Sequence, residues 1–290
     1  MAKNNKADMS SRQTPGTELS MISSGGGFIA NHITVDSGLT PDGTGVSQPH
    51  GTTVMDVQTS GDIDITFNLT DRTAEHIAQY GENIAQRALT VNSGSQVCLK
   101  STAGGITVLD PKGDGTQADI LLTGLGTQAA QLRMEANEDL RTNRMEAEKA
   151  EVYLRTVGEN TQAGDLLIHR IQGKDLILEM DSAGDIRPAK GTNLMIQLTG
   201  DSTLRLAAVG DIGTLDYMAY IDVPCKVVVD RVNSFYADFN LRDFETYEQI
   251  QQIKEYAITQ GYLVSQAEAM AEKLLPFLQL NHDWTEFHQL

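Results

Sequence analysis

The spacing of three glycines in the second half of the chain constrains the fold most. Gly158, Gly184 and Gly210 follow one another at intervals of 26 residues. Around them, short runs alternate apolar and polar residues and are separated by Gly, Asp, Asn or Ser, which is the pattern of β-strands joined by turns. A constant interval of this size is typical of a chain that winds into coils, because each coil needs its neighbours to cover its apolar row.

These patterns predict an all-β fold, a right-handed parallel β-solenoid (β-helix) with a C-terminal α-helical hairpin. Residues 1–24 are expected to be a flexible lead-in, 25–240 the β-solenoid and 241–290 the helical cap. The cap is inferred from Phe244, Tyr247 and Ile250, which recur at helical spacing, and from Pro276, which would end a second helix. An antiparallel sandwich is the alternative architecture, but it predicts hairpin dipeptides and no fixed offset.

The glycines and the residues after them are interpreted as structural turns: Gly158, Gly184 with Asp185, and Gly210 with Asp211. Glycine is expected to supply positive φ at these bends, and the aspartate to bond its own backbone around the corner. Asp165 stands in a similar Gly-Asp pair. A column of such carboxylates on one face would suit a carbohydrate-active enzyme, but turn formation already accounts for them.

The phrase Gly-Asp-Ile between two strands resembles the filamentous haemagglutinin-type β-helix repeats of large secreted bacterial adhesins. It occurs at Gly61-Asp62-Ile63, Gly184-Asp185-Ile186 and Gly210-Asp211-Ile212, with Gly164-Asp165-Leu166 as a variant. The resemblance implies a long passive scaffold that displays binding surfaces, and it brings no catalytic residues.

One loop is a candidate calcium site, because it offers oxygen ligands on a glycine-rich segment: Asp110, Asp114 and Asp119. Its spacing matches neither the EF-hand nor the calcium-binding β-roll nonapeptide, so a plain turn is the favoured interpretation and no other cofactor is expected. Cys98 and Cys225 are the only cysteines. Two cysteines are too few for a disulfide framework, and they are expected to be structural thiols.

Charge and hydropathy limit the partners. The formal net charge of −17 opposes binding to nucleic acid. No apolar run approaches the ~20 residues that a membrane-spanning helix needs, so membrane insertion is not expected. The first residues lack the apolar core of a secretory signal, so an exported protein would have to be a longer chain or assembly.

The predicted function is therefore non-catalytic: a structural or adhesive scaffold on a cell surface or in an extracellular assembly, with protein or carbohydrate surface ligands and the capacity to self-associate. Two alternatives remain open. One is a structural fibre component of a phage or injection-machine particle, and the other is a carbohydrate-active β-helix enzyme, which would need an acid and a base clustered in a groove.

Overall fold

Parallel strands dominate the structure. The computed structural model describes residues 7–12, 18–37, 39–41, 47–49, 52–67, 87–109, 118–158, 164–188, 193–223, 226–241, 263 and 266. Chain contacts divide the protein into two units, Met1–Asn240 and Leu241–Leu290. The first unit contains an 18-stranded sheet, and a separate antiparallel pair is formed by β4 (Leu39–Pro41) and β5 (Ser47–Pro49).

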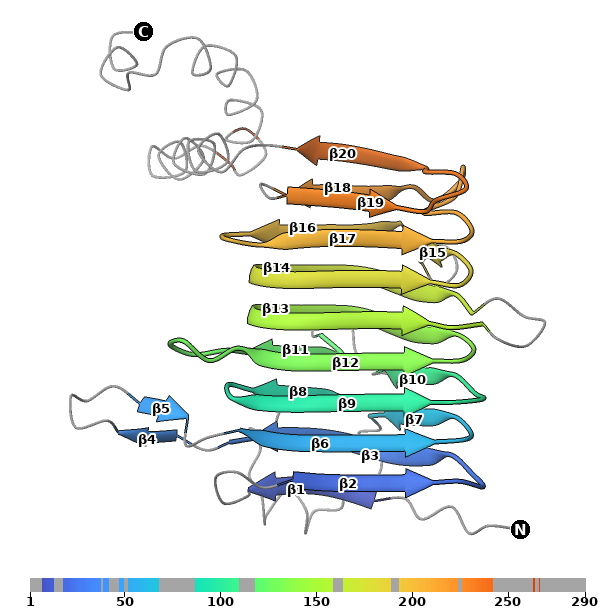
Figure 1. The fold of residues 1–290 in the computed structure, drawn as a ribbon. Coiled ribbons are helices and arrows are strands. Elements are labelled where there is room, and N and C mark those ends of the chain that lie inside the picture. The colour runs from blue at the N-terminus through green and yellow to red at the C-terminus, as the bar shows by residue number, and fades with distance from the viewer. Residues whose placement is uncertain are drawn as a thin grey trace, which may run out of the picture. The chain divides into compact units, whose positions relative to one another are not determined.

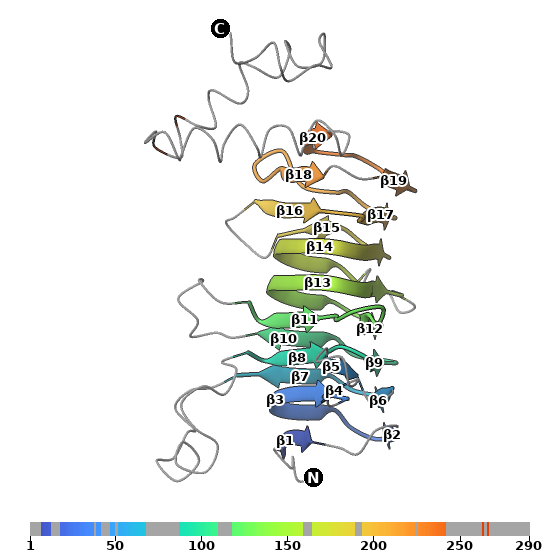
Figure 2. The same cartoon turned by 90° about the vertical axis from the view of Figure 1, so that its left-hand side faces the viewer.

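The strands of the large sheet lie one above another in chain order (Figures 1 and 2). Their pairings fall into sets that we call sides 1, 2 and 3, in the order in which the chain visits them, and each level of the stack is called a tier. Side 1 contains β2 (Glu18–Ser23), β6 (Thr53–Thr59), β9 (Ser95–Ser101), β12 (Ala130–Ala136), β17 (Thr203–Ala208) and β19 (Lys226–Asp230). Side 2 contains β7 (Ile63–Thr66), β10 (Ile106–Leu109) and β15 (Ile186–Arg187). Side 3 contains β8 (Leu89–Asn92), β11 (Ile120–Thr123), β16 (Leu194–Thr199), β18 (Ala219–Val223) and β20 (Ala237–Leu241).

Three longer strands run through more than one side. They are β3 (Phe28–Asp36), β13 (Leu140–Thr156) and β14 (Leu166–Ser182). The two 17-residue strands β13 and β14 pair in parallel along almost their whole length. Because their pairing passes through all three sides, it links these sides without a break.

The predicted 26-residue offset is confirmed by the register. Leu154 of β13 pairs with Met180 of β14, and Met180 pairs with Leu206 of β17. The side chains of all three are buried, with at most 1% of their surface exposed. Residues one interval apart therefore lie directly above one another, as the alternating pattern requires.

The interior is an apolar stack in which each tier covers the next. On side 2 it is built from residues in direct register, each fully buried: Ile63, Ile106, Leu140, Leu166, Ile186 and Ile212. Full burial of one such side chain contributes about 1.5–3 kcal/mol. Since a single tier has too little interior to fold alone, stability comes from the contacts between tiers.

The predicted fold class is corrected by the pairing of the sheet. Six strands form a closed ring of parallel pairs, to which the other strands add: β3, β7, β10, β13, β11 and β8. The sheet is thus a closed parallel barrel with extra strands, and not the plain β-solenoid predicted. The ring closes because β3 and β13 each continue around a bend and pair with other strands on two sides. The alternation of apolar and polar residues in the sequence does not show where a strand bends without ending.

The ends of the chain also differ from the prediction. No helix stands among the described elements, and the expected hairpin at 241–290 lies outside the described residues, except for Leu241, Leu263 and Gln266. At the other end, β1 (Ala7–Arg12) pairs with β3 and β2 pairs with β6, within the residues expected to form a flexible lead-in. The described residues include no helix long and apolar enough to span a bilayer.

Candidate functional site

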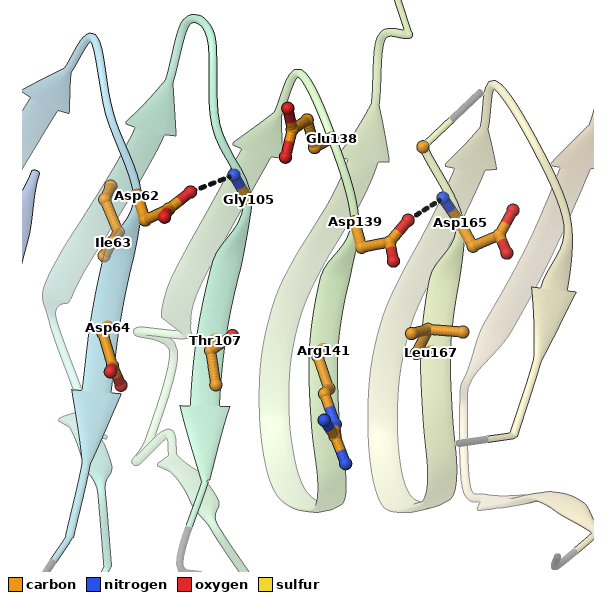
Figure 3. Close-up of a pocket in the computed structure, with 11 residues that line it drawn as sticks. Asp62, Ile63, Asp64, Gly105, Thr107, Glu138, Asp139, Arg141, Asp165 and Leu167 are labelled. Carbon is orange, nitrogen blue, oxygen red and sulfur yellow. Dashed lines mark hydrogen bonds between the residues drawn. The ribbon is translucent and has the colours of Figure 1, made fainter. Parts of the chain in front are cut away.

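A column of aspartates marks the corner where side 1 turns into side 2. Asp139, Asp165, Asp185 and Asp211 each precede an inward-facing residue of the side 2 stack. The Oδ1 atom of Asp139 accepts a hydrogen bond of 2.9 Å from the backbone N–H of Asp165 (Figure 3). Asp165 likewise accepts from the amide of Asp185, and Asp185 from that of Asp211, at 2.8 Å each. The first three carboxylates therefore hold the backbone of the following tier, whereas Oδ1 of Asp211 accepts a hydrogen bond of 2.8 Å from the side-chain amide of Asn233.

The predicted turn residues lie at these bends, but two details of their chemistry differ. Asp185 bonds the next tier and not its own corner. Gly158 has a φ of +64°, as expected, whereas Gly184 and Gly210 are not among the described glycines with positive φ. Gly210 is required by a close approach, since a Cβ atom there would overlap the Asp185 carboxylate.

A pocket of about 630 Å³ lies on the outer surface of side 2, beside the start of this column (Figure 3). Its floor is formed by Gly105 and Thr107, which are short residues flanked by longer ones on the neighbouring tiers. On one side stand Asp62 and Asp64, and on the other the strand that carries Arg141. The remaining lining residues are Ile63, Glu138, Asp139, Gly164, Asp165 and Leu167.

Gly105 interrupts the aspartate column. It precedes Ile106, which pairs with Ile63 on one tier and with Leu140 on the next, so it occupies the place that Asp62 and Asp139 take on those tiers. The backbone N–H of Gly105 donates to the Oδ1 atom of Asp62 at 2.9 Å. Because glycine has no carboxylate, this tier leaves an opening between the carboxylates of Asp62 and Asp139.

Arg141 is the cationic side chain that lines the pocket, and it is exposed. Its guanidinium makes no hydrogen bond or ion pair with any side chain in the described part of the protein. In Figure 3 it extends along the strand and away from Asp139, with Thr107 between it and Asp64. Glu138 also lines the pocket, and its carboxylate has no partner within the described ranges.

The corresponding arginine two tiers further along is paired. Arg141 is in register with Leu167, and Leu167 with Arg187. Arg187 reaches back one tier to the Asp165 carboxylate, with Nε and Nη2 at 3.0 and 2.7 Å from Oδ2. The residue one tier before Arg141 that corresponds to Asp165 is Gly105, which has no carboxylate. Arg141 therefore lacks the anionic partner that its counterpart has.

The candidate calcium ligands are only partly visible. Asp110 and Asp114 lie outside the described residues. Asp119 is 3% exposed, and its Oδ2 atom accepts hydrogen bonds of 2.9 Å from the backbone amides of Asn143 and Arg144. This carboxylate holds a bend of β13. Among the described residues, no group of three or more His, Cys, Asp or Glu side chains is arranged to hold a metal.

Side 1 carries a network of ion pairs. Glu135 lies 2.7 Å from the ammonium of Lys100 and 3.9 Å from the guanidinium of Arg155. The hydrogen bond from Lys100 is the main reason that the pKa of Glu135 is lowered from its ordinary value. Exposed pairs of this kind contribute about 0–1 kcal/mol each. The network gives side 1 a regular, mixed-charge surface.

Cys98 lies on the same surface, on the tier before Arg133. It is a free thiol, and burial raises its pKa, with a further increase from the nearby Asp56 carboxylate. A raised pKa makes a thiol less reactive. Cys225 lies outside the described residues.

The pocket was missed at the sequence level. The sequence pointed to Asp165, Asp185 and Asp211 because Gly-Asp pairs recur, but not to Asp139, which follows a glutamate. The pocket arises where the pair is replaced by Gly104-Gly105. Aligning the inward residues of successive tiers would have revealed this substitution. The lengths of the segments between Ile63, Ile106 and Leu140 differ, however, and hide the equivalence.

Comparisons with protein-family models, with curated proteins and with solved structures found no match to this chain. The resemblance to filamentous haemagglutinin-type repeats accordingly stays a prediction.

Proposed function

We propose that this protein is a non-catalytic structural scaffold that displays binding surfaces on a cell surface or in an extracellular assembly. The observation that carries the proposal is the aspartate column: Asp139, Asp165 and Asp185 each use Oδ1 to hold a backbone amide of the next tier. Carboxylates in such a column stabilise the stack. A general acid or base needs a carboxyl group that is free to exchange a proton with substrate.

The surfaces of the sheet support the same proposal. Side 1 presents ion pairs in fixed register, and side 2 presents the pocket. Strands paired on both edges hold these side chains in place, since their backbone groups are already satisfied. Such a scaffold can present ligand-binding groups without a large conformational cost on binding.

The alternative of a carbohydrate-active enzyme is tested directly. The purified chain is incubated with a panel of neutral and acidic polysaccharides, binding is recorded on a glycan array, and products are analysed by mass spectrometry. We expect binding to at least one surface glycan, with no product released. The D139N and D216N variants serve as a matched pair, since Asp139 lines the pocket and Asp216 is exposed and lies outside it.

Product release that disappears in D139N and persists in D216N would refute a non-catalytic role. Absence of binding to all glycans and to extracellular matrix proteins would refute the display of binding surfaces.

A further inference from the structure

We infer that the pocket on side 2 binds a carboxylated sugar residue, whose carboxylate pairs with Arg141. The inference rests on the proposed function as a binding scaffold and names the ligand class. It starts from the opening at Gly105 and Thr107 in the outer surface, bounded by Asp64 on one tier and Arg141 on another.

The carboxylate is inferred from a missing internal partner. Arg187 is neutralised by Asp165 of the preceding tier, with contacts of 3.0 and 2.7 Å. Arg141 has the same place on its own tier, but Gly105 stands where the partner carboxylate would be. A ligand carboxylate in this opening restores the arrangement, and an arginine can bind it with two parallel hydrogen bonds.

The sugar hydroxyls are inferred from the other lining groups. Five carboxylates line the pocket, those of Asp62, Asp64, Glu138, Asp139 and Asp165. All but Glu138 already accept a hydrogen bond from a backbone amide or, at Asp64, from the Thr66 hydroxyl. Carboxylate oxygens only accept hydrogen bonds, and each carboxylate can accept more than one. A ligand that carries a carboxylate alone would be repelled by them. A ligand that also carries several hydroxyl donors satisfies them, and an acidic monosaccharide has this combination on one ring.

The size and the sparse apolar lining agree with a sugar. A volume of about 630 Å³ falls in the range of about 300–1,000 Å³ found for small-ligand sites. Leu167 is the apolar side chain on the outer face among its lining residues, since the side chain of Ile63 is buried in the core. An acidic peptide would need apolar anchors or free strand edges, whereas the strands that flank the pocket are paired on both edges.

Isothermal titration calorimetry of the full chain tests the inference. The probe is a hyaluronan tetrasaccharide, used with its glucuronate carboxylates free and again with the carboxylates methyl-esterified. We expect the free acid to bind, and the ester to bind about 10-fold more weakly or less because it loses the charge-assisted pair. A tetraglutamate peptide, which offers carboxylates without hydroxyls, should not bind.

Two variants locate the site. R141Q removes the guanidinium and should weaken binding about 10-fold or more. T107L fills the opening with the side chain that β14 carries at the equivalent position, Leu167, and should abolish binding while preserving the fold. R133Q removes an exposed arginine of side 1 and should leave affinity unchanged.

The inference would be overturned if the free acid and the ester bound with equal affinity, or if R133Q lost as much affinity as R141Q. Tighter binding of tetraglutamate than of the tetrasaccharide would also overturn it. No binding of either sugar would also overturn it, while leaving the scaffold proposal intact. Cleavage of the tetrasaccharide, detected by mass spectrometry, would instead refute the non-catalytic function and leave the ligand class standing.

Discussion

Replacing Asp165 with alanine should destabilise the stack by about 1.5–4 kcal/mol. The carboxylate is 16% exposed and accepts a hydrogen bond of 2.8 Å from the Asp185 amide. A hydrogen bond to a charged group contributes about 1.5–3 kcal/mol, and its loss leaves the amide without an acceptor. The ion pair with Arg187, which is 38% exposed, adds about 0–1 kcal/mol because water screens it.

Urea denaturation of wild type, D165A and D165N measures this cost. D165N keeps an acceptor oxygen for the amide and should lose less stability than D165A. Hydrogen–deuterium exchange gives a local measurement, in which the Asp185 amide should exchange faster in D165A than in D165N. D216A is the control, and an exposed substitution of this kind should change stability by less than about 0.5 kcal/mol. If D165A unfolded at the same urea concentration as D216A, the column would not stabilise the stack.

Three further predictions concern the core, the pH dependence and the thiol. Leu178→Ala should lower the unfolding free energy by about 2–5 kcal/mol in urea denaturation, because the side chain is fully buried; a loss below ~1 kcal/mol would contradict the tight stacking. Lys100 holds the pKa of Glu135 below its ordinary value, so the stabilisation is present above that ordinary pKa and is lost as pH falls through the lowered one. Thermal denaturation of Lys100→Gln between neutral and acidic pH should therefore show a shallower acid loss than wild type, and identical slopes would exclude the contribution. Asp56→Asn should lower the pKa of the Cys98 thiol and speed its alkylation at mildly alkaline pH, followed by peptide mapping; an unchanged rate would rule out the influence of Asp56.

The inward residues and their offset were predictable from the sequence. The interval of 26 residues between the glycines predicts that residues 26 apart lie above one another, and Leu154, Met180 and Leu206 pair in this register. The reason is that alternation fixes which side chains face inward, and a constant interval fixes which of them stack. The pairs Gly61-Asp62 and Gly184-Asp185 lie between strands, and both residue types favour bends.

Features that depend on neighbouring tiers were not predictable in the same way. The hydrogen bond from the Asp211 amide to the Asp185 carboxylate can be predicted only when the distance between the two strands is known. The sequence alone suggested a local turn at Asp185. The closed ring of strands depends on β3 and β13 bending without a break. The opening at Gly105 depends on the absence of a side chain, which is visible only once tiers of different length are aligned.

The aspartate column has a consequence for how this chain can change in length. Asp139 bonds the amide of Asp165 as Asp185 bonds the amide of Asp211, so the levels from Asp139 to Asp211 present the same acceptor to the same donor. In-frame duplication or excision of a whole unit from the regular part of the chain would join matching interfaces. Genetic variation could thus lengthen or shorten the protein in whole steps, while a gain or loss of a few residues inside a strand would disrupt it.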